Sequence, residues 1–450
     1  MAVLLLMLSI PKASSYESYS SYNSRIDCGA STQTPATDNS DITWQTDEGL
    51  IKTGKNKVLP TSQTHFQMNT LRYFHKGHKN CYTLYFYDAY EKYLFRAGFY
   101  YGNYDGLSNP PRFRLEIDGT LWAKVTTSIN EEMVYCELLY ITKKSQARVC
   151  LIRTMDNNVP FISSLEAYKI YDAYNWMDNT TALYLHSGIN YGANASVEQN
   201  IDFRAEPYNR IWKSKEMSNY LSIQADSIYQ IYSFAENMPP WPVIGYAIQA
   251  PSLTDSIYLS IDFSPRTAVQ AYFVLYFLDP VSRLAQNQTS SVEIYIDNNK
   301  MAVTDIPNID ILDEECRVVT LFSVPVNGSA NVTISPAEGS TLAPLLNAME
   351  VFSAIDVSEG GHLFNFSLHH FITSTTADTF LTTSEPLAAR IQAVVWRSSF
   401  QSIPSPPLAQ AEADFDGAEK RESGAEEREE ERRAESKEEA PFAATPWPRR

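Results

Sequence analysis

Three acidic residues in the first third of this 450-residue chain have types and spacing that could support catalysis. Glu116 and Asp118 alternate along one expected strand, and Asp105 lies in the preceding loop. Alternate residues of a strand share a face, so Glu116 and Asp118 could serve as the carboxylate pair of a glycosidase. Charged residues at alternate positions are also the ordinary solvent face of a strand. The pair alone therefore does not define an enzyme.

Other kinds of catalytic and metal chemistry have no motif in the sequence. There is no Gly-x-Ser-x-Gly elbow, no Walker A loop, and no kinase Gly-rich loop, HRD or DFG element. His75 and His78 lack a third ligand nearby, and the adjacent Lys76 and Lys79 oppose a bound cation. We therefore expect no cofactor, no metal site and no kinase activity in this chain.

A turn rich in aromatic and polar residues is a stronger candidate for binding. Residues 99–106 read Phe-Tyr-Tyr-Gly-Asn-Tyr-Asp-Gly. Carbohydrate sites combine flat aromatic faces with polar groups that bind hydroxyls, so the candidate ligand-binding residues are Tyr100, Tyr101, Asn103, Tyr104 and Asp105. The structural alternative is a turn with a purely conformational role, which requires unusual backbone angles. Gly102 and Gly106 would supply positive φ, and Asn103 and Asp105 would cap the turn.

The elements that position this turn are expected to be antiparallel strands. Aromatic and aliphatic residues alternate with polar ones over residues 80–101, and a further strand over 113–117 ends on the turn dipeptide Asp118-Gly119. The chain contains 28 tyrosines, a residue type that suits half-buried sheet surfaces. The pattern predicts an all-β fold with ample length for two or three domains.

The second half of the chain repeats the first in outline. Ile189-Asn190-Tyr191-Gly192 corresponds to Ile26-Asp27-Cys28-Gly29, Arg210-Ile211-Trp212 to Ile42-Thr43-Trp44, and the segment 344–350 to 160–166. The offset drifts from about 163 to 184 residues, so loops differ while strand order holds. We predict a tandem duplication of one β-sandwich, with a first sandwich at 25–178 and a second at 179–357.

Both ends of the chain differ in composition from these two blocks. Residues 1–24 are predicted to be a signal peptide and a flexible lead. They comprise an apolar run of the length of a signal-peptide core, without basic residues before it, and a polar low-complexity stretch. Residues 358–450 are predicted to form a disordered acidic tail, since their charged stretches cannot bury enough surface to fold. No later segment reaches the roughly 18 apolar residues that a membrane helix needs.

The charge of the chain bounds its partners. The formal net charge is −17, of which residues 411–450 contribute −5 from 13 acidic and 8 basic residues. This balance argues against nucleic acid and against an anionic membrane as partners, since binding phosphate groups needs clustered Lys and Arg. Direct membrane insertion is not expected either, because no later segment is long and apolar enough. Basic peptides are electrostatically suitable ligands.

Several ordered motifs carry a family resemblance. They are Ile26-Asp27-Cys28-Gly29, Ile42-Thr43-Trp44, Leu71-Arg72-Tyr73-Phe74, Asn80-Cys81-Tyr82-Thr83-Leu84, Tyr93-Leu94-Phe95-Arg96-Ala97, the turn 101–106, and Val149-Cys150-Leu151 ahead of 160–166. Over residues 26–357 the chain resembles the malectin-like extracellular domain of plant receptor-like kinases that carry leucine-rich repeats. The resemblance implies two jelly-roll-like β-sandwiches in tandem.

The resemblance also implies a function. It points to a non-catalytic extracellular recognition module, secreted or at the cell surface, that binds cell-wall carbohydrate or a small secreted peptide, with receptor kinases as co-receptors. The cleft between the sandwiches is the expected site, since ligands favour domain interfaces. The repeats, membrane helix and kinase that family members usually carry are not found in this chain. Two alternatives stay open: a carbohydrate-active enzyme with an Asp/Glu pair, and a truncated product without function.

Cysteines and glycosylation sequons fit a secretory route. Five cysteines lie far apart with no Cys-x-x-Cys pair, which excludes zinc-ribbon and thioredoxin spacings. Up to two disulfides could form, and the candidates in the family-like segments are Cys28, Cys81 and Cys150, with the pairing left open. The Asn-x-Ser/Thr sequons, each a candidate for N-glycosylation, are Asn179, Asn194, Asn287, Asn327, Asn331 and Asn365.

Overall fold

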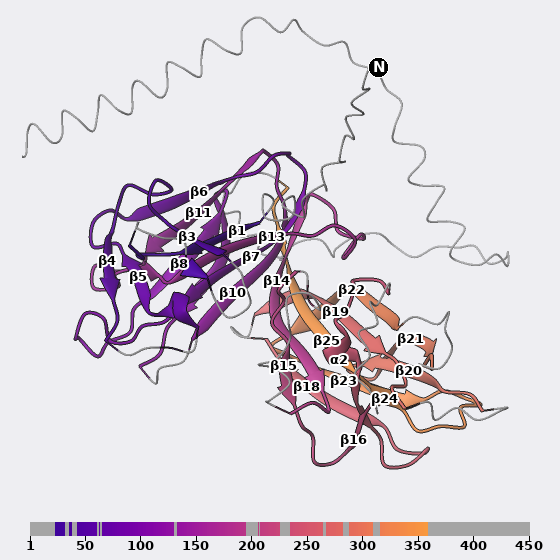
Figure 1. Ribbon diagram of the computed structural model, residues 1–450. Helices are drawn as coiled ribbons and strands as arrows, with labels where there is room; N and C mark the ends of the chain where they lie inside the picture. Colours follow the sequence, from indigo (N-terminus) through magenta and orange to yellow (C-terminus); the bar gives the residue numbers. More distant parts are fainter. Residues whose placement is uncertain are drawn as a thin grey trace, which may run out of the picture. The chain divides into compact units, whose positions relative to one another are not determined.

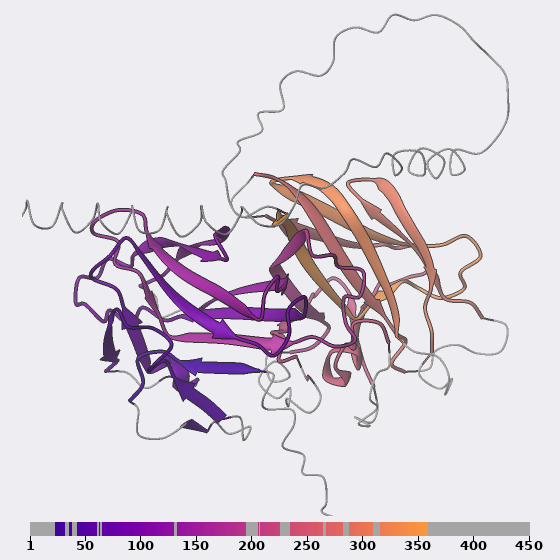
Figure 2. The ribbon, with the colours of Figure 1, turned by 90° about the horizontal axis from the view of Figure 1, so that it is seen from above.

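Strands make up nearly all of the regular structure in the described part of the chain (Figures 1 and 2). The computed structural model describes residues 23–31, 36–37, 43–60, 63, 65–129, 133–194, 206, 208–225, 235–263, 267–281, 288–308 and 316–358. The all-β expectation is confirmed. Residues 1–22 of the expected signal peptide and lead, and residues 359–450 of the expected tail, lie outside these ranges.

The first half of the chain contributes part of one large sheet and two smaller sheets. Its strands in the large sheet are β1 (Ser24–Asp27), β2 (Ala36–Thr37), β3 (Thr43–Thr46), β7 (Lys92–Phe99), β10 (Val134–Ile141) and β13 (Ser164–Lys169). The smaller sheets contain β6 (Lys79–Tyr85), β8 (Arg112–Ile117), β9 (Thr120–Thr126) and β11 (Gln146–Arg153), and β4 (Lys55–Val58), β5 (Thr70–Tyr73) and β12 (Phe161–Ile162). A 3-10 turn, η2 (Phe66–Met68), precedes β5.

The second half continues the same large sheet and adds one small sheet. Its strands in the large sheet are β14 (Thr181–Tyr191), β15 (Lys213–Lys215), β18 (Ile257–Asp262), β19 (Ala268–Phe277), β20 (Ser291–Ile296), β21 (Asn299–Asp305), β22 (Arg317–Asn327), β23 (Ser329–Pro336) and β25 (Ala348–Asp356). The small sheet contains β16 (Leu221–Gln224), β17 (Tyr246–Gln249) and β24 (Leu345–Leu346), next to a short helix, α2 (Trp241–Ile244).

Strand β14 connects the two halves within the large sheet. It pairs along its length with β25, and near its start Leu183 and Tyr184 also pair with β10 of the first half. Further along, on the side that β10 has left, β14 pairs in parallel with β15. Between these two neighbours the register shifts at Leu185–Ser187. In the described part of the chain, the middle of β14 therefore has a strand neighbour on one side only.

Three hydrophobic clusters hold the described chain together. The first gathers residues of the first half, such as Phe95 and Leu165, and the second gathers residues of the second half, such as Phe273 and Met349. The third draws on both halves, from Leu94 and Leu139 to Tyr276 and Phe352, together with residues of the segments 170–177, 208–225 and 235–244. Strand β7 is buried on both faces because the first and third clusters cover opposite sides of it.

The strand registers support the duplication seen in the sequence. Ile26 of β1 pairs antiparallel with Leu165 and parallel with Gln45, and Ile189 of β14 pairs antiparallel with Met349 and parallel with Lys213. Trp44 and Trp212, one position earlier, therefore occupy equivalent places. The strand arrangement agrees with two tandem sandwiches. The domain boundary at 178/179 stays a prediction.

Candidate functional site

The aromatic rings of the turn at 100–106 are buried. Tyr100 and Tyr101 are each 1% exposed and Tyr104 is 8% exposed. The rings of Tyr101 and Tyr104 both pack against Phe161, with centroids 6.3 and 5.4 Å away. The tyrosine faces therefore do not form the exposed stacking platform that the sequence suggested. They belong to the first hydrophobic cluster.

The polar groups of this turn mostly bind one another. The Tyr101 hydroxyl donates to Asp105 Oδ1 at 2.6 Å, and burial together with this bond raises the pKa of Tyr101 to about 12. Asn103 Oδ1 accepts from the Ser108 amide at 2.8 Å, and Asn103, Gly102 and Gly106 all have positive φ. These are the features of the structural alternative. Ligand binding at this turn stays a prediction that now depends on the exposed Asn103 and Asp105.

A hollow of about 360 Å³ lies next to the end of this turn. Its lining, called the loop hollow below, consists of Asn109, Pro110, Arg112, Thr127, Met155, Asn157 and Asn158. Asn109 donates its amide to the Tyr101 hydroxyl, which ties the loop hollow to the turn. Met155 is 67% exposed. Among the described residues, Arg112 bonds through its backbone to Asn158 and Thr154, and its guanidinium forms no ion pair. The hollow thus presents amides, a cation and an exposed thioether.

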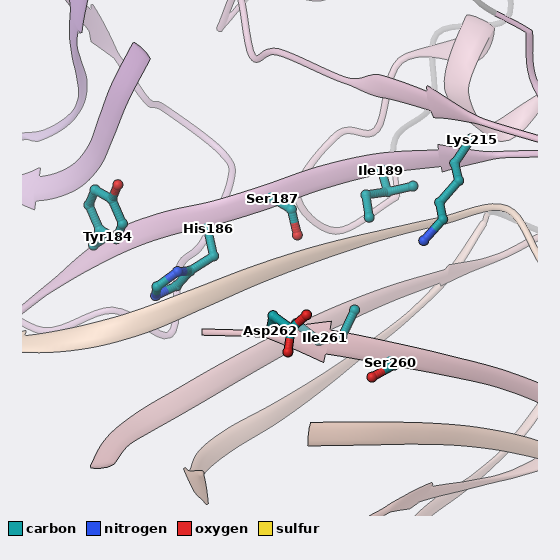
Figure 3. A pocket seen from close by; sticks show the side chains of 8 residues that line it. All are labelled: Tyr184, His186, Ser187, Ile189, Lys215, Ser260, Ile261 and Asp262. Carbon is teal, nitrogen blue, oxygen red and sulfur yellow. The ribbon is translucent and has the colours of Figure 1, made fainter. Parts of the chain in front are cut away.

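A second hollow, of about 370 Å³, lies where β14 has a neighbour on one side only (Figure 3). Its lining, called the strand hollow below, comes from β14 (Tyr184, His186, Ser187, Ile189), β15 (Lys215) and β18 (Ser260, Ile261, Asp262). Tyr184 packs against the first hydrophobic cluster and Ile189 against the second. The strand hollow therefore lies at the junction of the two halves, where the sequence led us to expect a ligand.

The strand hollow combines two charges with a neutral ring. His186 Nε2 lies 3.0 Å from Ser353 Oγ, and burial lowers the pKa of His186 to about 4, so its imidazole is uncharged near neutral pH. Lys215 and Asp262 are exposed, and neither forms an ion pair in the described part of the chain. Figure 3 shows both charged side chains bordering the same space. The hollow can offer a cation, an anion and hydroxyl groups to a ligand.

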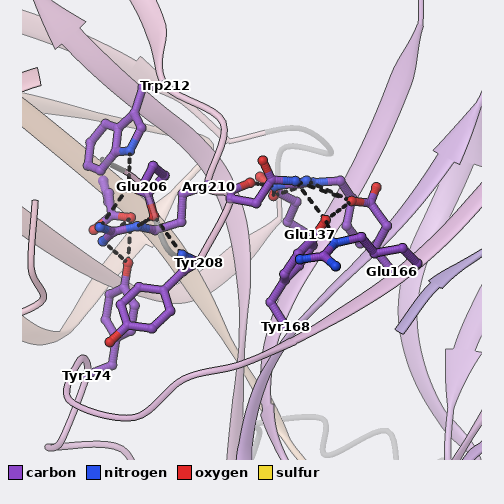
Figure 4. Close-up of polar contacts among 12 residues, drawn as sticks. Glu137, Glu166, Tyr168, Tyr174, Glu206, Tyr208, Arg210 and Trp212 are labelled. Atoms are coloured by element: carbon purple, nitrogen blue, oxygen red, sulfur yellow. Dashed lines mark hydrogen bonds and ion pairs between the residues drawn. The ribbon is translucent and has the colours of Figure 1, made fainter. Parts of the chain in front are cut away.

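Two buried ionic clusters lie on the face of the large sheet that the third hydrophobic cluster covers (Figure 4). Arg96 of β7 donates to Glu137 of β10 at 2.7 Å and to Glu166 of β13 at 3.2 Å. Because these strands are adjacent, the three side chains share the face of the sheet that the third hydrophobic cluster covers. Arg96 also donates to the backbone carbonyl of Asn209, a residue from the second half.

The second cluster centres on Arg210, the residue after Asn209. Its guanidinium pairs with Glu206 at 3.0 Å and lies 3.8 Å from Glu350, while Tyr174 and Tyr276 each donate to Glu350 at 2.6 Å. The two clusters together hold two arginines and four glutamates. Burial raises the pKa of Glu137 and Glu350, and the arginines offset this only in part. These carboxylates are engaged with protein groups, which indicates a structural role.

The acidic residues considered for glycoside hydrolysis also have partners. Glu116 pairs with Lys79 at 2.8 Å, and Asp118 accepts from the Arg148 amide at 2.7 Å and from the Tyr140 hydroxyl at 3.1 Å. Asp105 is committed to its own turn. The geometry gives no support to an acid–base pair among these three residues.

The cysteines form one disulfide. Cys81 of β6 and Cys150 of β11 are paired residues of adjacent strands and are joined by a bond. Cys28, the third candidate, is a buried free thiol, because strand β1 places it in the first hydrophobic cluster away from the other two. Of the three candidates, Cys81 and Cys150 form the disulfide and Cys28 does not take part in it. Cys136 and Cys316 are also free and buried.

Four of the sequon asparagines lie on the described surface. They are exposed at Asn179, Asn194, Asn327 and Asn331, whereas Asn287 and Asn365 lie outside the described residues. Their glycosylation stays a prediction. No three His, Cys, Asp or Glu side chains in the described ranges are arranged to hold a metal ion. Within the same ranges, no helix has the length and apolar character to cross a membrane.

Comparison with known proteins identifies the family. The profile of the malectin-like domain matches residues 26–354, which span both halves and contain most members of the three hydrophobic clusters. The chain belongs to the malectin-like family. The malectin-like match begins at the first strand of the large sheet and ends within the last one, β25.

Related malectin-like chains include plant receptor kinases. The uncharacterized protein At1g24485 of Arabidopsis thaliana is 30% identical over 340 residues, which cover 73% of this chain and 63% of that protein. The LRR receptor-like serine/threonine-protein kinase IOS1 of Arabidopsis thaliana is 29% identical over 336 residues, covering 73% of this chain. This chain spans only 36% of the length of IOS1.

Solved structures share the malectin-like fold. The ANX1 ectodomain from Arabidopsis thaliana superposes with a TM-score of 0.59 at 16% identity, covering 75% of this chain and 97% of the ectodomain. The structure of the plant peptide RALF23 in complex with FER and LLG2 contains a chain with a TM-score of 0.58 at 16% identity, with coverage of 75% and 96%. The fold of this chain is thereby the one that these solved chains have.

None of the residues that line the strand hollow was predicted from the sequence as a binding residue. Its lining comes from segments near 184–189, 215 and 260–262, which no motif connects. The only signal was the general expectation of a site between the halves. The charge pair Lys215 and Asp262 becomes visible only when β14, β15 and β18 are placed together.

Proposed function

We propose that this chain is a non-catalytic extracellular recognition module that binds a small secreted peptide at the strand hollow. The observation that carries the proposal is the pair of exposed charges, Lys215 and Asp262, bordering a hollow at the junction of two malectin-like halves. Peptides carry both signs of charge along an alternating chain, so such a pair suits them. The family membership supports the extracellular setting.

A related complex supports a peptide as the ligand class. The structure of FER with the peptide RALF23 and LLG2 shows that a protein of this fold takes part in an assembly with a peptide and a further protein. By analogy, a secreted peptide and a co-receptor protein are the partners proposed here, at the cell surface or in the extracellular space. The low sequence identity means that the fold, and not the contact residues, carries the analogy.

Cell-wall carbohydrate is the second candidate ligand, and the loop hollow favours it. Asn109 and Asn157 offer amides that can bind sugar hydroxyls, whereas the side-chain amide of Asn158 already bonds to Arg112 and Thr154. Arg112 adds a cation with no ion-pair partner among the described residues. The burial of the tyrosine rings removes the stacking surface that many carbohydrate sites use. For this reason the peptide is the principal proposal.

A binding screen with two charge reversals tests the proposal. The full chain is screened against a panel of secreted peptides and a panel of cell-wall glycans. Lys215→Glu should weaken peptide binding at least tenfold and leave glycan binding unchanged, while Arg112→Glu should do the reverse. The matched control is Lys57→Glu, because Lys57 is exposed on β4 and lines neither hollow. Failure of every peptide to bind would contradict the principal proposal.

A further inference from the structure

Strand β18 ends one branch of the large sheet. In the described part of the chain it pairs only with β23. A strand with one partner directs half of its backbone N–H and C=O groups away from that partner.

Two independent bonds fix the direction of the backbone groups. The Phe263 amide, just after the strand, donates to the Gly328 carbonyl at 2.9 Å. The N–H and C=O groups of every second residue counted back from Phe263, such as Ile261, therefore point toward β23. The N–H and C=O groups of the residues in between must then point away from β23. The Tyr258 amide does so, because it donates at 2.8 Å to the side-chain hydroxyl of Tyr220.

Ser260 and Asp262 are in phase with Tyr258, so their N–H and C=O groups also face outward. The Tyr220 hydroxyl covers both outward groups of Tyr258, since it accepts from the Tyr258 amide and donates to the Tyr258 carbonyl at 3.5 Å. Among the described residues no side chain covers the outward groups of Ser260 or Asp262 in the same way. Both residues line the strand hollow. The hollow thus borders backbone donors and acceptors set at the spacing of a strand.

We infer that the strand hollow receives an extended peptide segment, which pairs with the outward edge of β18 at Ser260 and Asp262 as an added strand. The inference rests on the proposed function and specifies how the peptide is held. Main-chain bonds to an exposed edge supply affinity in such complexes, and alternate side chains supply specificity. Two residues with free N–H and C=O groups can exchange up to about four hydrogen bonds with the added strand.

The side chains around the edge define the chemistry of the segment. Asp262 lies on the exposed face of β18, so the residue opposite it should be Lys or Arg. Lys215, on the far side of the hollow, suits an acidic residue further along the segment. The neutral His186 and the partly buried Tyr184 and Ile189 line the inner side and suit apolar or hydroxyl side chains. The ligand is thus an alternating segment with a basic and an acidic residue.

An array of short peptides tests this mode of binding. The probes are acetylated and amidated octapeptides in which valine or threonine alternates with lysine and glutamate in every charge order, presented to the full chain. The tightest binder is then remade in two forms, N-methylated at alternate amides, with the two patterns offset by one residue. Only one form has lost the amides that face β18, so binding should fall tenfold or more for that form alone.

Proline substitution tests the same edge from the protein side. Ser260→Pro removes an outward N–H without removing a bond to β23, and it should weaken the tightest binder at least tenfold. The control is Val303→Pro on β21, another edge strand, where the Ile306–Ser290 bond implies that the Val303 amide also faces outward. Asp262→Lys, which keeps the backbone intact, should shift the preferred residue opposite it from basic to acidic. Thermal unfolding verifies that all variants are folded.

The outcomes separate this inference from the proposed function. If a peptide binds but tolerates both N-methylated forms and Ser260→Pro, strand pairing is wrong and peptide recognition stands. If no peptide binds while glycans do, both the inference and the principal proposal fail. If size-exclusion chromatography shows a dimer that Ser260→Pro dissociates, the edge pairs with a second copy of the chain, and the peptide assignment is overturned.

Discussion

Glu166 and Glu350 occupy equivalent positions in the two halves of the chain, yet their positive partners come from different places. Glu166 on β13 pairs in register with Arg96 on β7, and Glu350 on β25 pairs in register with Val274 on β19. The cation that β19 lacks is supplied by Arg210, from the segment that follows β14. The duplicated sheet has therefore kept the buried carboxylate and changed the source of its charge partner.

Loss of Arg210 should be strongly destabilising. In Arg210→Met, the buried Glu206 and Glu350 lose their cation, and removing one partner of a buried pair typically costs about 3–5 kcal/mol. Urea unfolding followed by tyrosine and tryptophan fluorescence measures the change. The control is Lys300→Met, which removes an exposed ion pair with Glu293 and should leave the midpoint unchanged. Equal midpoints for both variants would show that the Arg210 cluster is not a stabilising unit.

Asp27 should make the stability of the fold depend on pH. Burial raises the pKa of Asp27 to about 7, although its carboxylate accepts a bond from Thr70 at 2.6 Å. Because the folded state holds this proton more tightly than the unfolded state, the contribution is complete below about pH 4. It is lost as the pH rises through about 7. The free energy of unfolding should therefore fall over this window by a few kcal/mol at most. Each unit of difference between the folded and unfolded pKa corresponds to about 1.36 kcal/mol.

Replacement by asparagine isolates this effect. Asn190 holds the place equivalent to Asp27 in the second half, so an amide fits this backbone position. Asp27→Asn should flatten the fall in stability between pH 4 and 7, and the variant should gain on the wild type as the pH rises. Asp88→Asn, at an exposed position, serves as control and should leave the profile unchanged. A wild-type profile that is level over this range would contradict the argument.

The disulfide assignment leads to a count of free thiols. Iodoacetamide treatment of the denatured, unreduced chain should label three cysteines, Cys28, Cys136 and Cys316, and peptide mapping should recover Cys81 linked to Cys150. The bond joins positions 69 residues apart, so its loss should cost about 2–5 kcal/mol. Labelling of one residue or of all five would refute the assignment.

Two equivalent glycines should be intolerant of a side chain. A Cβ at Gly29 would lie 2.1 Å from the Leu71 carbonyl oxygen, and one at Gly192 would lie 2.4 Å from the Ala247 carbonyl oxygen. Both residues also have φ near +80°. Gly29→Ala should lower the thermal midpoint much more than Gly49→Ala, where φ is +87° but no atom lies within 4 Å. The difference between the two variants measures the clash without the cost of positive φ.

The all-β class, the duplication and the demanding turn could be predicted from the sequence because they depend on local patterns. Alternation predicted the strands, and Asn-Gly and Asp-Gly pairs predicted turns such as Asp118-Gly119, where Asp118 and Gly119 both have positive φ. The match of Ile26-Asp27-Cys28-Gly29 to Ile189-Asn190-Tyr191-Gly192 reappears in the strand registers and in the paired glycines. These features are encoded by residues close together in the chain.

Burial and long-range pairing were decided only by the tertiary structure. The composition of 99–106 suits an exposed aromatic platform and a buried turn equally. The tyrosine rings are buried because they pack against Phe161, which lies on a strand more than fifty positions later in the chain. The partners of Cys81 and Arg210 and the meeting of Lys215 with Asp262 likewise depend on strands brought together by the sheet. By itself the sequence determined the strands, the turns and the repeat, because neighbouring residues fix these. Only the fold decided which groups are free to bind, because solvent exposure is a property of the whole assembled sheet.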